Sequence, residues 1–450
     1  MQLLMPDNVR FIIKKLQDEG FEAYAVGGCV RDSYLGLTPH DWDITTNALP
    51  LQVKSLFRRT IDVGIQHGTV KIMLGDEGYE VTTYRIDGEY EDNRHPKEVI
   101  FTASLEEDLK RRDFTINAMA YSESTGIIDL FNGIQDIENG VIRAVGEPSE
   151  RFSEDALRIL RALRFSARFD YEIDRITKDA ITELAPTLAK ISAERIREEL
   201  EKLLISEHPN RLRMAYELGV TKVILPEWDR MMQCEQNTKH HYLSVGEHTL
   251  RAIELVTSEF GNLSSEERRI VCIAALFHDV AKPIMKTTDA NGVDHFKGHP
   301  EEGSILVKDI LRRLKYDNDT IGRVSTLIKY HDLRPSLTFP NVRKLIVKVG
   351  VGNMPCYMVL RWVDMWAQSE YEREEKSSYL KEMERIYKKI LSDGDCLSIK
   401  DLAVTGKDLI AAGVKSGPGL GEMLEEMLEL VMQDPLLNEH DILMERFVKV

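Results

Sequence analysis

Two short stretches near the start of the chain decide its first fold: "AVGGCVRD" (Ala25–Asp32) and, shortly after it, "HDWDIT" (His40–Thr45). In the first stretch, Gly27 and Gly28 stand between a predicted strand and a predicted helix. Backbone N–H groups at such a turn can approach a phosphate, and Arg31 would add positive charge. Glycines at a strand end are more often a simple turn, so this stretch alone does not establish a phosphate site.

In the second stretch, Asp41 and Asp43 are two residues apart. On a strand, both carboxylates would point to the same side. Two converging carboxylates suit Mg²⁺, which prefers hard oxygen ligands and keeps waters for substrate phosphates. The alternative is a solvated strand edge that carries two acids. Glu80, in "YEVTTYR" (79–85), could add a third carboxylate for a two-metal site, although a single glutamate on a strand is most often exposed.

The composition is that of a globular chain. The 450 residues are 43% hydrophobic and 30% charged, and they are enough for three or four structural units. We expect a cytoplasmic protein, because no apolar stretch is long enough to cross a bilayer, no secretory leader is present and the five cysteines form no CxxC pair. The net charge of −16 argues against indiscriminate coating of nucleic acid. It does not exclude a nucleic-acid partner, because affinity follows local positive surface.

The order of patterns along the chain predicts an α+β fold, with a small mixed head followed by a long all-helical body. Segments 22–26, 68–74 and 79–85 have strand patterns, and Gly75–Gly78 is a hairpin turn between the last two. After Phe152 the pattern is helical almost throughout. We predict four regions: a head at 1–150, a helical neck at 151–230, a middle domain at 231–345 and a helical tail at 346–450.

An arginine-rich helix is predicted from "SEDALRILRALRFSARF" (Ser153–Phe169), with Ser153 as its N-cap. Glu154 and Asp155 would then lie at the positive end of the helix. One face would be buried, and the opposite arc would carry guanidinium groups. The commoner use of such a pattern is an amphipathic helix with a solvated basic face. The arginines on this arc are Arg158, Arg161, Arg164 and Arg168.

The spacing of Asp155 and Arg158 suggests a way to select a base. The two residues are three apart, so they are neighbours on a helix surface. A carboxylate only accepts hydrogen bonds and a guanidinium only donates them. Cytosine and adenine each offer an amino donor beside a ring-nitrogen acceptor, whereas uracil and guanine offer the reverse. Such a pair would admit C and A and reject U and G, because a mismatch leaves buried polar groups unpaired.

Taken in order, these motifs resemble the class II tRNA nucleotidyltransferase and poly(A) polymerase family. The similarity is collinear over most of residues 20–230. It rests on "GGCVRD", "DWD", "LKRRDFTINAMAY" (Leu109–Tyr121), "DLFNGIQDIENGVIRAVG" (Asp129–Gly146), the arginine helix and "ISAERIREELEKLL" (Ile191–Leu204). Segment Thr405–Leu443 is similar to the C-terminal region of bacterial CCA-adding enzymes, except that Asp434 stands where a glycine is expected.

The resemblance implies a function and assigns roles to residues. It implies Mg²⁺-dependent addition of CCA to tRNA from CTP and ATP, with Asp41, Asp43 and Glu80 catalytic and Mg²⁺ on Asp41 and Asp43. The tail would hold the tRNA elbow. The expected nucleotide-binding residues are Gly28, Arg31, Arg112, Asp155, Arg158, Arg161 and Arg164, with Arg112 at the triphosphate. Residues 84–109 fill the interval whose deletion is typical of CC-adding members, which favours an enzyme able to add the terminal A.

A set of histidines and aspartates in the middle of the chain resembles an HD phosphohydrolase domain. "LFHDVAKP" (Leu276–Pro283) is the specific element, and any one of the outlying histidines is more often an ordinary packed side chain. Imidazole and carboxylate ligands suit a second divalent metal. The alternative is a helical fold kept for tRNA support without turnover. The expected ligands are His248, His278, Asp279, His299, His331 and Asp364.

Three rivals stay open. One is an A-adding or poly(A)-synthesising member of the same family. Another is a metal-dependent HD phosphohydrolase whose head only binds nucleotide. The third is a non-catalytic RNA-binding protein. The sequence does not give the oligomeric state, the metal in the HD cluster or the target of any hydrolysis.

Overall fold

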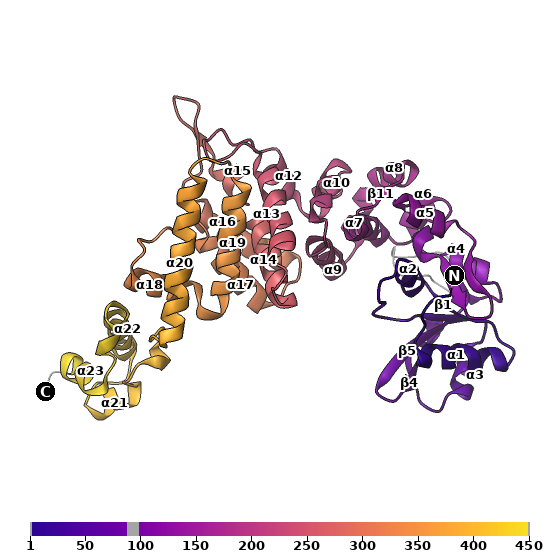
Figure 1. Cartoon of the computed structure of the whole chain (residues 1–450), viewed down its shortest axis with the longest axis horizontal. Coiled ribbons are helices and arrows are strands. Elements are labelled where there is room, and N and C mark those ends of the chain that lie inside the picture. The colour runs from indigo at the N-terminus through magenta and orange to yellow at the C-terminus, as the bar shows by residue number, and fades with distance from the viewer. Residues whose placement is uncertain (1, 88–98, 449–450) are drawn as a thin grey trace. The chain divides into compact units, whose positions relative to one another are not determined.

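The computed structural model describes residues 2–87 and 99–448 and divides into two compact units, Met1–Pro226 and Glu227–Val450 (Figure 1). The first unit holds the mixed sheet and the arginine helix, and the second is almost entirely helical. The α+β prediction of a mixed head followed by a helical body is confirmed. The finer division into four regions stays a prediction.

The head is built on a seven-stranded mixed sheet in the order β3-β4-β5-β2-β1-β8-β9. Its strands β2 and β5 are parallel, and the other neighbours are antiparallel. The predicted hairpin is present, because Leu74 pairs with Glu77 across a turn at Gly75 and Asp76. The strands are β1 (Ala23–Val26), β2 (Ile44–Thr46), β3 (Thr60–Gly64), β4 (Thr69–Leu74), β5 (Glu77–Thr83), β8 (Met119–Ser122) and β9 (Gly126–Asp129).

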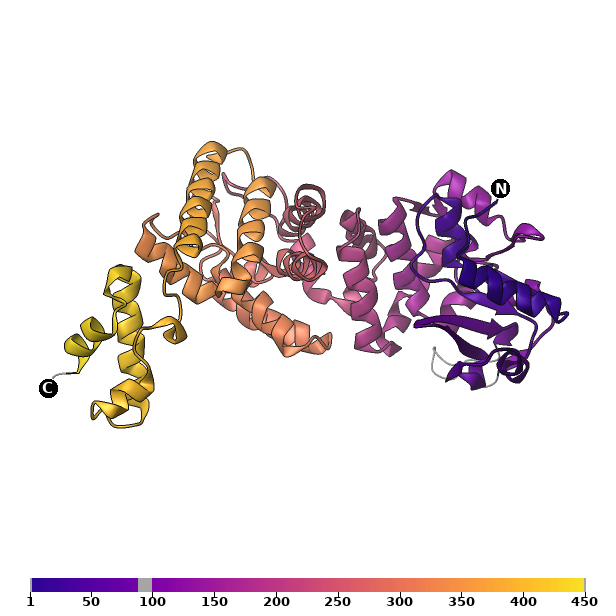
Figure 2. The same cartoon turned by 60° about the horizontal axis from the view of Figure 1, so that its bottom comes forward.

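Helices and short strand pairs complete the first unit (Figure 2). Helix α1 packs on the sheet through its apolar face, which explains its amphipathic pattern. The other helices are α2 (Gly28–Tyr34), α3 (Pro50–Leu56), α4 (Leu105–Lys110), α5 (Gly133–Asn139), α6 (Pro148–Glu154), α7 (Leu157–Phe169), α8 (Arg175–Leu184), α9 (Ala193–Leu204), α10 (Leu212–Glu217) and α11 (Thr221–Ile224), with α1 at Asp7–Asp18. The short strands are β6 (Arg85–Asp87) with β7 (Val99–Phe101), and β10 (Val141–Ile142) with β11 (Glu172–Ile173).

The predicted start of the arginine helix is wrong. Ser153 lies within α6, and the chain turns extended at Asp155 (φ −142°, ψ 101°) before α7 begins at Leu157. The carboxylate of Asp155 accepts a hydrogen bond from the backbone N–H of Leu157 at 3.1 Å. Asp155 therefore fills the capping role that we expected of Ser153, because its side chain reaches an N–H group that the first turn leaves unpaired.

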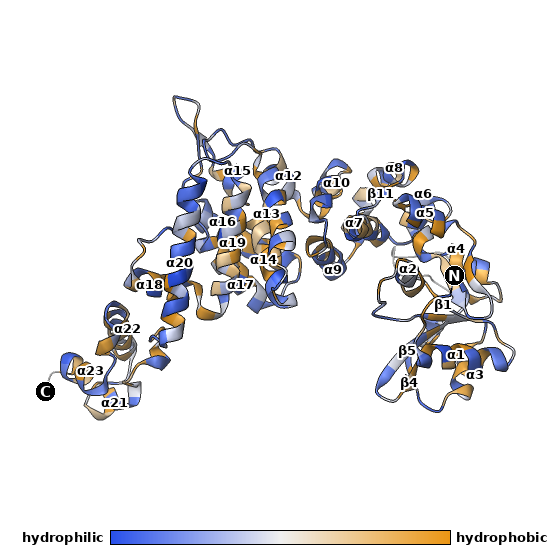
Figure 3. Cartoon of the chain, in the orientation of Figure 1, coloured by the Kyte–Doolittle hydropathy of each residue, from blue (hydrophilic) through white to orange (hydrophobic). Residues whose placement is uncertain are grey.

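The second unit packs its helices around two apolar members, α14 and α19, which are buried along most of their length. Figure 3 shows the contrast in hydropathy between α14 and the more hydrophilic α20.

The helices of the second unit are α12 (Pro226–Met232), α13 (Val245–Glu259), α14 (Ser265–Phe277), α15 (Lys282–Met285), α16 (His299–Arg313), α17 (Asn318–Tyr330), α18 (Phe339–Val349), α19 (Met354–Ala367), α20 (Arg373–Asp393), α21 (Gly406–Ala411), α22 (Pro418–Gln433) and α23 (His440–Phe447). Strands β12 (Thr287–Thr288) and β13 (Asp294–His295) form a small hairpin. None of the described helices is long and apolar enough to cross a membrane.

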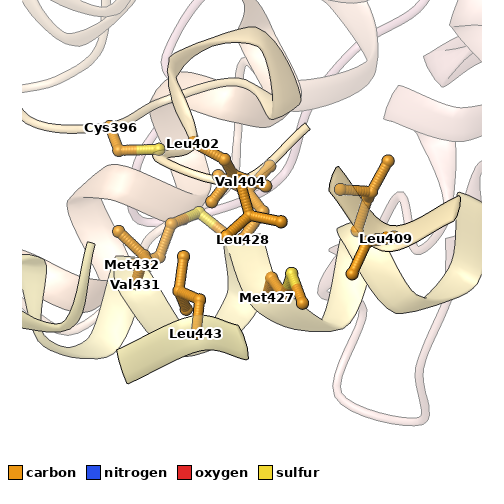
Figure 4. Close-up of a cluster of buried hydrophobic side chains, with 10 residues drawn as sticks. Cys396, Leu402, Val404, Leu409, Met427, Leu428, Val431, Met432 and Leu443 are labelled. Carbon is orange, nitrogen blue, oxygen red and sulfur yellow. The ribbon is translucent and has the colours of Figure 1, made fainter. Parts of the chain in front are cut away.

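The last three helices have a small core of their own (Figure 4). Met427 and Val431 of α22 pack with Leu409 of α21 and Leu443 of α23, and all four are buried. Arg343 of α18 joins this core to the rest of the unit, because it donates to Met432 O at 3.0 Å and to an oxygen of Asp395 at 2.6 Å.

Two glycines of the second unit give a matched test of the packing. A Cβ on Gly246 would stand 2.8 Å from the backbone nitrogen of Met232, whereas a Cβ on Gly322, on the exposed side of α17, would meet open space. We predict that Gly246→Ala lowers the free energy of unfolding by about 1–3 kcal/mol. Gly322→Ala should raise it by about 0.5–1 kcal/mol, because alanine is the better helix former. Urea unfolding followed by circular dichroism measures both; equal effects would contradict the packing of α12 on α13.

Candidate active site and metal cluster

The three head carboxylates lie at neighbouring positions of the sheet. Asp41 and Asp43 come just before β2 rather than on it, and both are exposed. Because Ile44 pairs with Val81 in parallel register, Glu80 lies beside Asp43. Desolvation raises the pKa of Asp43; Arg112 lowers it, and the charges of Glu80 and Asp41 raise it further. This mutual repulsion is what a divalent cation would relieve.

The glycine turn makes room for Arg112. Gly27 has a left-handed backbone (φ +83°), and a Cβ on it would stand 2.9 Å from Nη1 of Arg112. Nε of Arg112 is buried and forms no hydrogen bond with the described residues, while Nη2 lies 3.5 Å from Asp108. Glycine at position 27 therefore permits both the turn and a guanidinium beside the carboxylates.

Arg31 points into the protein interior. It is 3% exposed and lies over the rings of Phe165 and Phe169 of α7, at 5.1 and 4.9 Å. Its guanidinium donates to Asp32 at 2.8 Å and to the side-chain oxygen of Asn117. These contacts join α2 to α7, and the expected contact of Arg31 with a triphosphate stays a prediction.

The four arginines of α7 are held by acids from other parts of the unit instead of forming a solvated basic face. Each guanidinium has its own carboxylate partner. The pairs are Arg158 with Glu154 (2.5 Å), Arg161 with Asp113 (2.6 Å), Arg164 with Glu199 (2.6 Å) and Arg168 with Asp32 (2.9 Å).

The expected base-selecting pair is also anchored. Arg195 of α9 binds both oxygens of Asp155, at 3.1 and 2.7 Å. Arg158 donates to the backbone oxygens of Arg151 (2.9 Å) and Arg111 (3.1 Å). Asp155 and Arg158 thus lie at the start of α7 in defined orientations. Arg195 fixes Asp155, and the two backbone oxygens fix Arg158.

The six expected metal ligands of the second unit converge from five places in the chain. His248 lies on α13, Asp364 on α19 and His299 at the start of α16, while the other three follow the ends of α14 and α17. Among the described residues, two groups have ligand atoms within 4.8 Å of one another: His248, His278 and Asp279, and Asp279, His299 and His331. The head carboxylates form no group this tight.

Asp279 is shared by both groups, which we call the histidine cluster. Its Oδ2 lies 3.2 Å from Nε2 of His278, and its Oδ1 lies 3.3 Å from Nε2 of His299. Asp364 approaches His248 at 3.0 Å. Nζ of Lys282 forms an ion pair with Oδ2 of Asp279 at 2.7 Å, and among the residues that the structure describes neither oxygen accepts a hydrogen bond of good geometry. A buried carboxylate among imidazoles fits a site for divalent metal.

The backbone orients three of these histidines toward the cluster. Nδ1 of His278, His299 and His331 lies 2.7–2.8 Å from the carbonyl oxygens of Ala275, Phe296 and Ile328. A carbonyl only accepts, so Nδ1 carries the proton and the Nε2 lone pair faces the cluster.

Comparisons with known proteins agree with this architecture. The Poly A polymerase head domain matches residues 23–143, and the probable RNA and SrmB-binding site of polymerase A matches 170–232. A putative tRNA nucleotidyltransferase domain 2 matches 303–447. The CCA-adding enzyme of Leuconostoc mesenteroides is 36% identical over 447 residues, covering 97% of this chain and 94% of that enzyme. This chain belongs to the CCA-adding enzyme family.

Other members of the CCA-adding enzyme family extend the match. The enzyme of Streptococcus suis is also 36% identical, over 97% of this chain and 95% of its own length. The Bacillus stearothermophilus CCA-adding enzyme in complex with CTP has a TM-score of 0.74 at 29% identity, and 98% of each chain is covered. The family membership expected from the motifs is therefore confirmed.

Sequence reasoning missed the acids and the arginine that hold the family's arginine helix in this chain. Asp113 pairs with Arg161, Glu199 pairs with Arg164, and Arg195 pairs with Asp155. A signal was available in "ISAERIREELEKLL", where Arg195 and Glu199 are four residues apart and so share one face of α9.

The pair of the partly exposed Arg161 and the buried Asp113 predicts an acid-sensitive stability. Burial opposes ionisation, but Arg161 and the Asn117 amide hold the pKa of the Asp113 carboxyl below its ordinary value. The stabilisation is therefore complete above the unfolded pKa of about 3.9 and is lost as pH falls through the folded pKa. We predict that Arg161→Met costs about 1–3 kcal/mol at neutral pH and progressively less below about pH 4.

Urea unfolding across a pH series measures this difference. The matched control is Arg175→Met, which removes an exposed ion pair with Asp179 and should leave the stability unchanged. A cost for Arg161→Met that stays constant into strong acid would contradict the assignment.

Proposed function

We propose that this enzyme adds cytidine, cytidine and adenosine to the 3′ ends of tRNA, using CTP and ATP and releasing pyrophosphate. The observation that carries the proposal is the 36% identity to a CCA-adding enzyme across nearly the full length of both chains. The head supports it with carboxylates beside a guanidinium and with an anchored Asp155 and Arg158. Five buried, unpaired cysteines fit action in the reducing cytoplasm.

Asp41 and Asp43 would hold Mg²⁺, with Glu80 as the third carboxylate. The bound metal would lower the barrier for attack of the RNA 3′-hydroxyl on the α-phosphate and neutralise the leaving pyrophosphate. Arg112 would bind the triphosphate, and the position of its guanidinium beside Gly27 and Asp43 supports this role. Gly28 would let the backbone N–H groups that open α2 approach the same phosphates.

Asp155 and Arg158 would select the incoming base at the start of α7. The Asp155 carboxylate would accept from the exocyclic amino group of C or A, and the Arg158 guanidinium would donate to the adjacent ring nitrogen. Arg195 supports this role because its two bonds fix the plane of the Asp155 carboxylate. Arg161 and Arg164 stay candidates for nucleotide contact, and each would have to share its guanidinium with the acid it already binds.

Two expectations about tRNA stay proposals. The tail would hold the tRNA elbow, yet α22 exposes four glutamates, Glu422, Glu425, Glu426 and Glu429, which would repel phosphates. We therefore expect RNA to meet other faces of the tail. The segment used to separate CCA from CC addition runs through residues 88–98, which lie outside the described residues.

Sequencing the 3′ ends of a tRNA that lacks CCA, after incubation with all four nucleotides, tests the main proposal. We predict that CCA is added and that Asp41→Ala or Asp43→Ala abolishes addition, with Asp76→Ala in the exposed hairpin turn as the control. Addition of A alone, or of a long A tail, would favour the A-adding or poly(A)-synthesising relative. Unchanged incorporation in the Asp43 variant would remove the assigned metal site.

Asp155→Ala tests the selection of the base. We predict that misincorporation from UTP rises roughly ten- to a hundredfold relative to CTP, because each lost pair of base contacts is worth about 1–3 kcal/mol of discrimination. Glu150→Ala, an exposed acid on α6, should leave the ratio unchanged. The ratio is measured in single-nucleotide extension assays, and an equal loss with CTP, ATP and UTP would contradict the selecting role.

A second candidate function belongs to the histidine cluster. We propose that it holds divalent metal and hydrolyses a phosphate ester, because three imidazoles are oriented around a buried carboxylate. The bound metal would polarise the phosphoryl group. The chain would supply the cavity beside the cluster, about 720 Å³ in volume, whose walls include Lys282, Lys297 and Lys329.

Metal analysis separates this site from the head. We predict that Mn²⁺-loaded protein loses bound metal and p-nitrophenyl phosphate hydrolysis in His278→Ala. His295→Ala should keep both, because His295 lines the same cavity outside the cluster. Addition of CCA should survive in both variants. Metal binding without any hydrolysis would leave the cluster a structural site.

A further inference from the structure

A chain of buried polar side chains connects α20 to the histidine cluster. The ammonium group of Lys376 lies 3.0 Å from Oε1 of Gln368, and Nε2 of Gln368 lies 3.2 Å from Oδ1 of Asp364. On its other side, Lys376 lies 3.1 Å from Nδ1 of His240. Gln368 and Lys376 are 7% and 8% exposed, so these contacts are shielded from water.

The donor properties of lysine fix the direction of every bond in this chain. An ammonium group only donates, so Gln368 must present its oxygen to Lys376 and its NH₂ to the Asp364 carboxylate. For the same reason, Nδ1 of His240 must accept. A neutral imidazole that accepts at Nδ1 carries its proton at Nε2, which leaves Nε2–H as the one donor of the His240 ring.

His240 lines the cavity of the histidine cluster. Asp279, His331 and Asp364 line the same cavity. The cavity walls carry cations as well as acids: Arg334 and Lys348 add to the lysines already named, and Asp294, Glu301 and Asp332 add to Asp279 and Asp364. A fixed N–H donor in such a cavity suits an anionic oxygen.

We propose that Lys376 is a positioning residue that keeps His240 in its Nε2–H form, so that His240 donates a hydrogen bond to a phosphoryl oxygen bound beside the histidine cluster. The binding role of His240 rests on the proposed hydrolytic site, whereas the effect of Lys376 on the ring does not. Gln368 carries the same control to Asp364 by turning its NH₂ toward that carboxylate.

The state of the ring is read from the ¹⁵N chemical shifts of histidine-labelled full-length protein, with the His240 signals assigned by their loss in His240→Gln. We expect the Nε2–H form in the wild type and a mixture of both forms in Lys376→Met. An Nδ1–H ring in the wild type, or an unchanged ring in Lys376→Met, would overturn the positioning role. Lys376→Gln repeats the test if the methionine variant fails to fold.

Calorimetric titration of Mn²⁺-loaded protein with inorganic phosphate tests the binding role. Glutamine places an amide N–H near the position of Nε2, whereas asparagine places it near Nδ1. We therefore expect His240→Gln to keep the affinity within about twofold, and His240→Asn and Lys376→Met to weaken it about five- to tenfold. Equal binding by the wild type and His240→Asn would overturn the donor role. Absence of phosphate binding in the metal-loaded wild type would contradict the proposed hydrolytic site. The protonated nitrogen of the His240 ring would still decide the role of Lys376.

Discussion

The first unit depends on the pairing of the guanidinium groups of α7 with carboxylates brought from other elements. The acids come from the end of α6, from the segment between α4 and β8, from α9 and from α2. A buried charge is tolerated only when it is paired, so each pair fixes where α7 can lie. An acidic chain thereby keeps a helix rich in arginine while each guanidinium is paired with a carboxylate.

This pairing would keep the proposed base-selecting residues, Asp155 and Arg158, rigid while the nucleotide changes. Asp155 is clamped by Arg195 and caps the helix, and Arg158 is tied to two backbone oxygens. A protein that replaces a template strand must hold its hydrogen-bonding groups as firmly as a base pair does. The turn at Gly27 leaves room for Arg112, because a side chain at position 27 would displace the Arg112 guanidinium.

Much of this arrangement could be predicted from the sequence, and the rest depended on tertiary contacts. The hairpin at Gly75 follows from turn residues between alternating strands. The convergence of His248 and His331 with His278 and Asp279 was expected only through a family resemblance, because no local pattern brings five segments together. The break at Asp155 was missed since Ser153 is an equally good cap by composition. The pairing of Asp113 and Asp32 with α7 could not be predicted, because ion pairs between distant segments leave no periodic trace, whereas Glu199 shares one face of α9 with Arg195.

The two units combine similar physical devices for different chemistry. In the head, charged side chains surround an exposed group of carboxylates. In the second unit, backbone carbonyls orient imidazoles of the buried histidine cluster, and Lys376 contacts the imidazole of His240. The central claim is that Asp155 and Arg158 recognise the base while Arg195 holds the carboxylate. The most direct measurement is a structure of the enzyme with CTP. The account predicts the cytosine edge within hydrogen-bond distance of both side chains, with the bond between Arg195 and Asp155 retained. A cytosine bound away from α7 would contradict it.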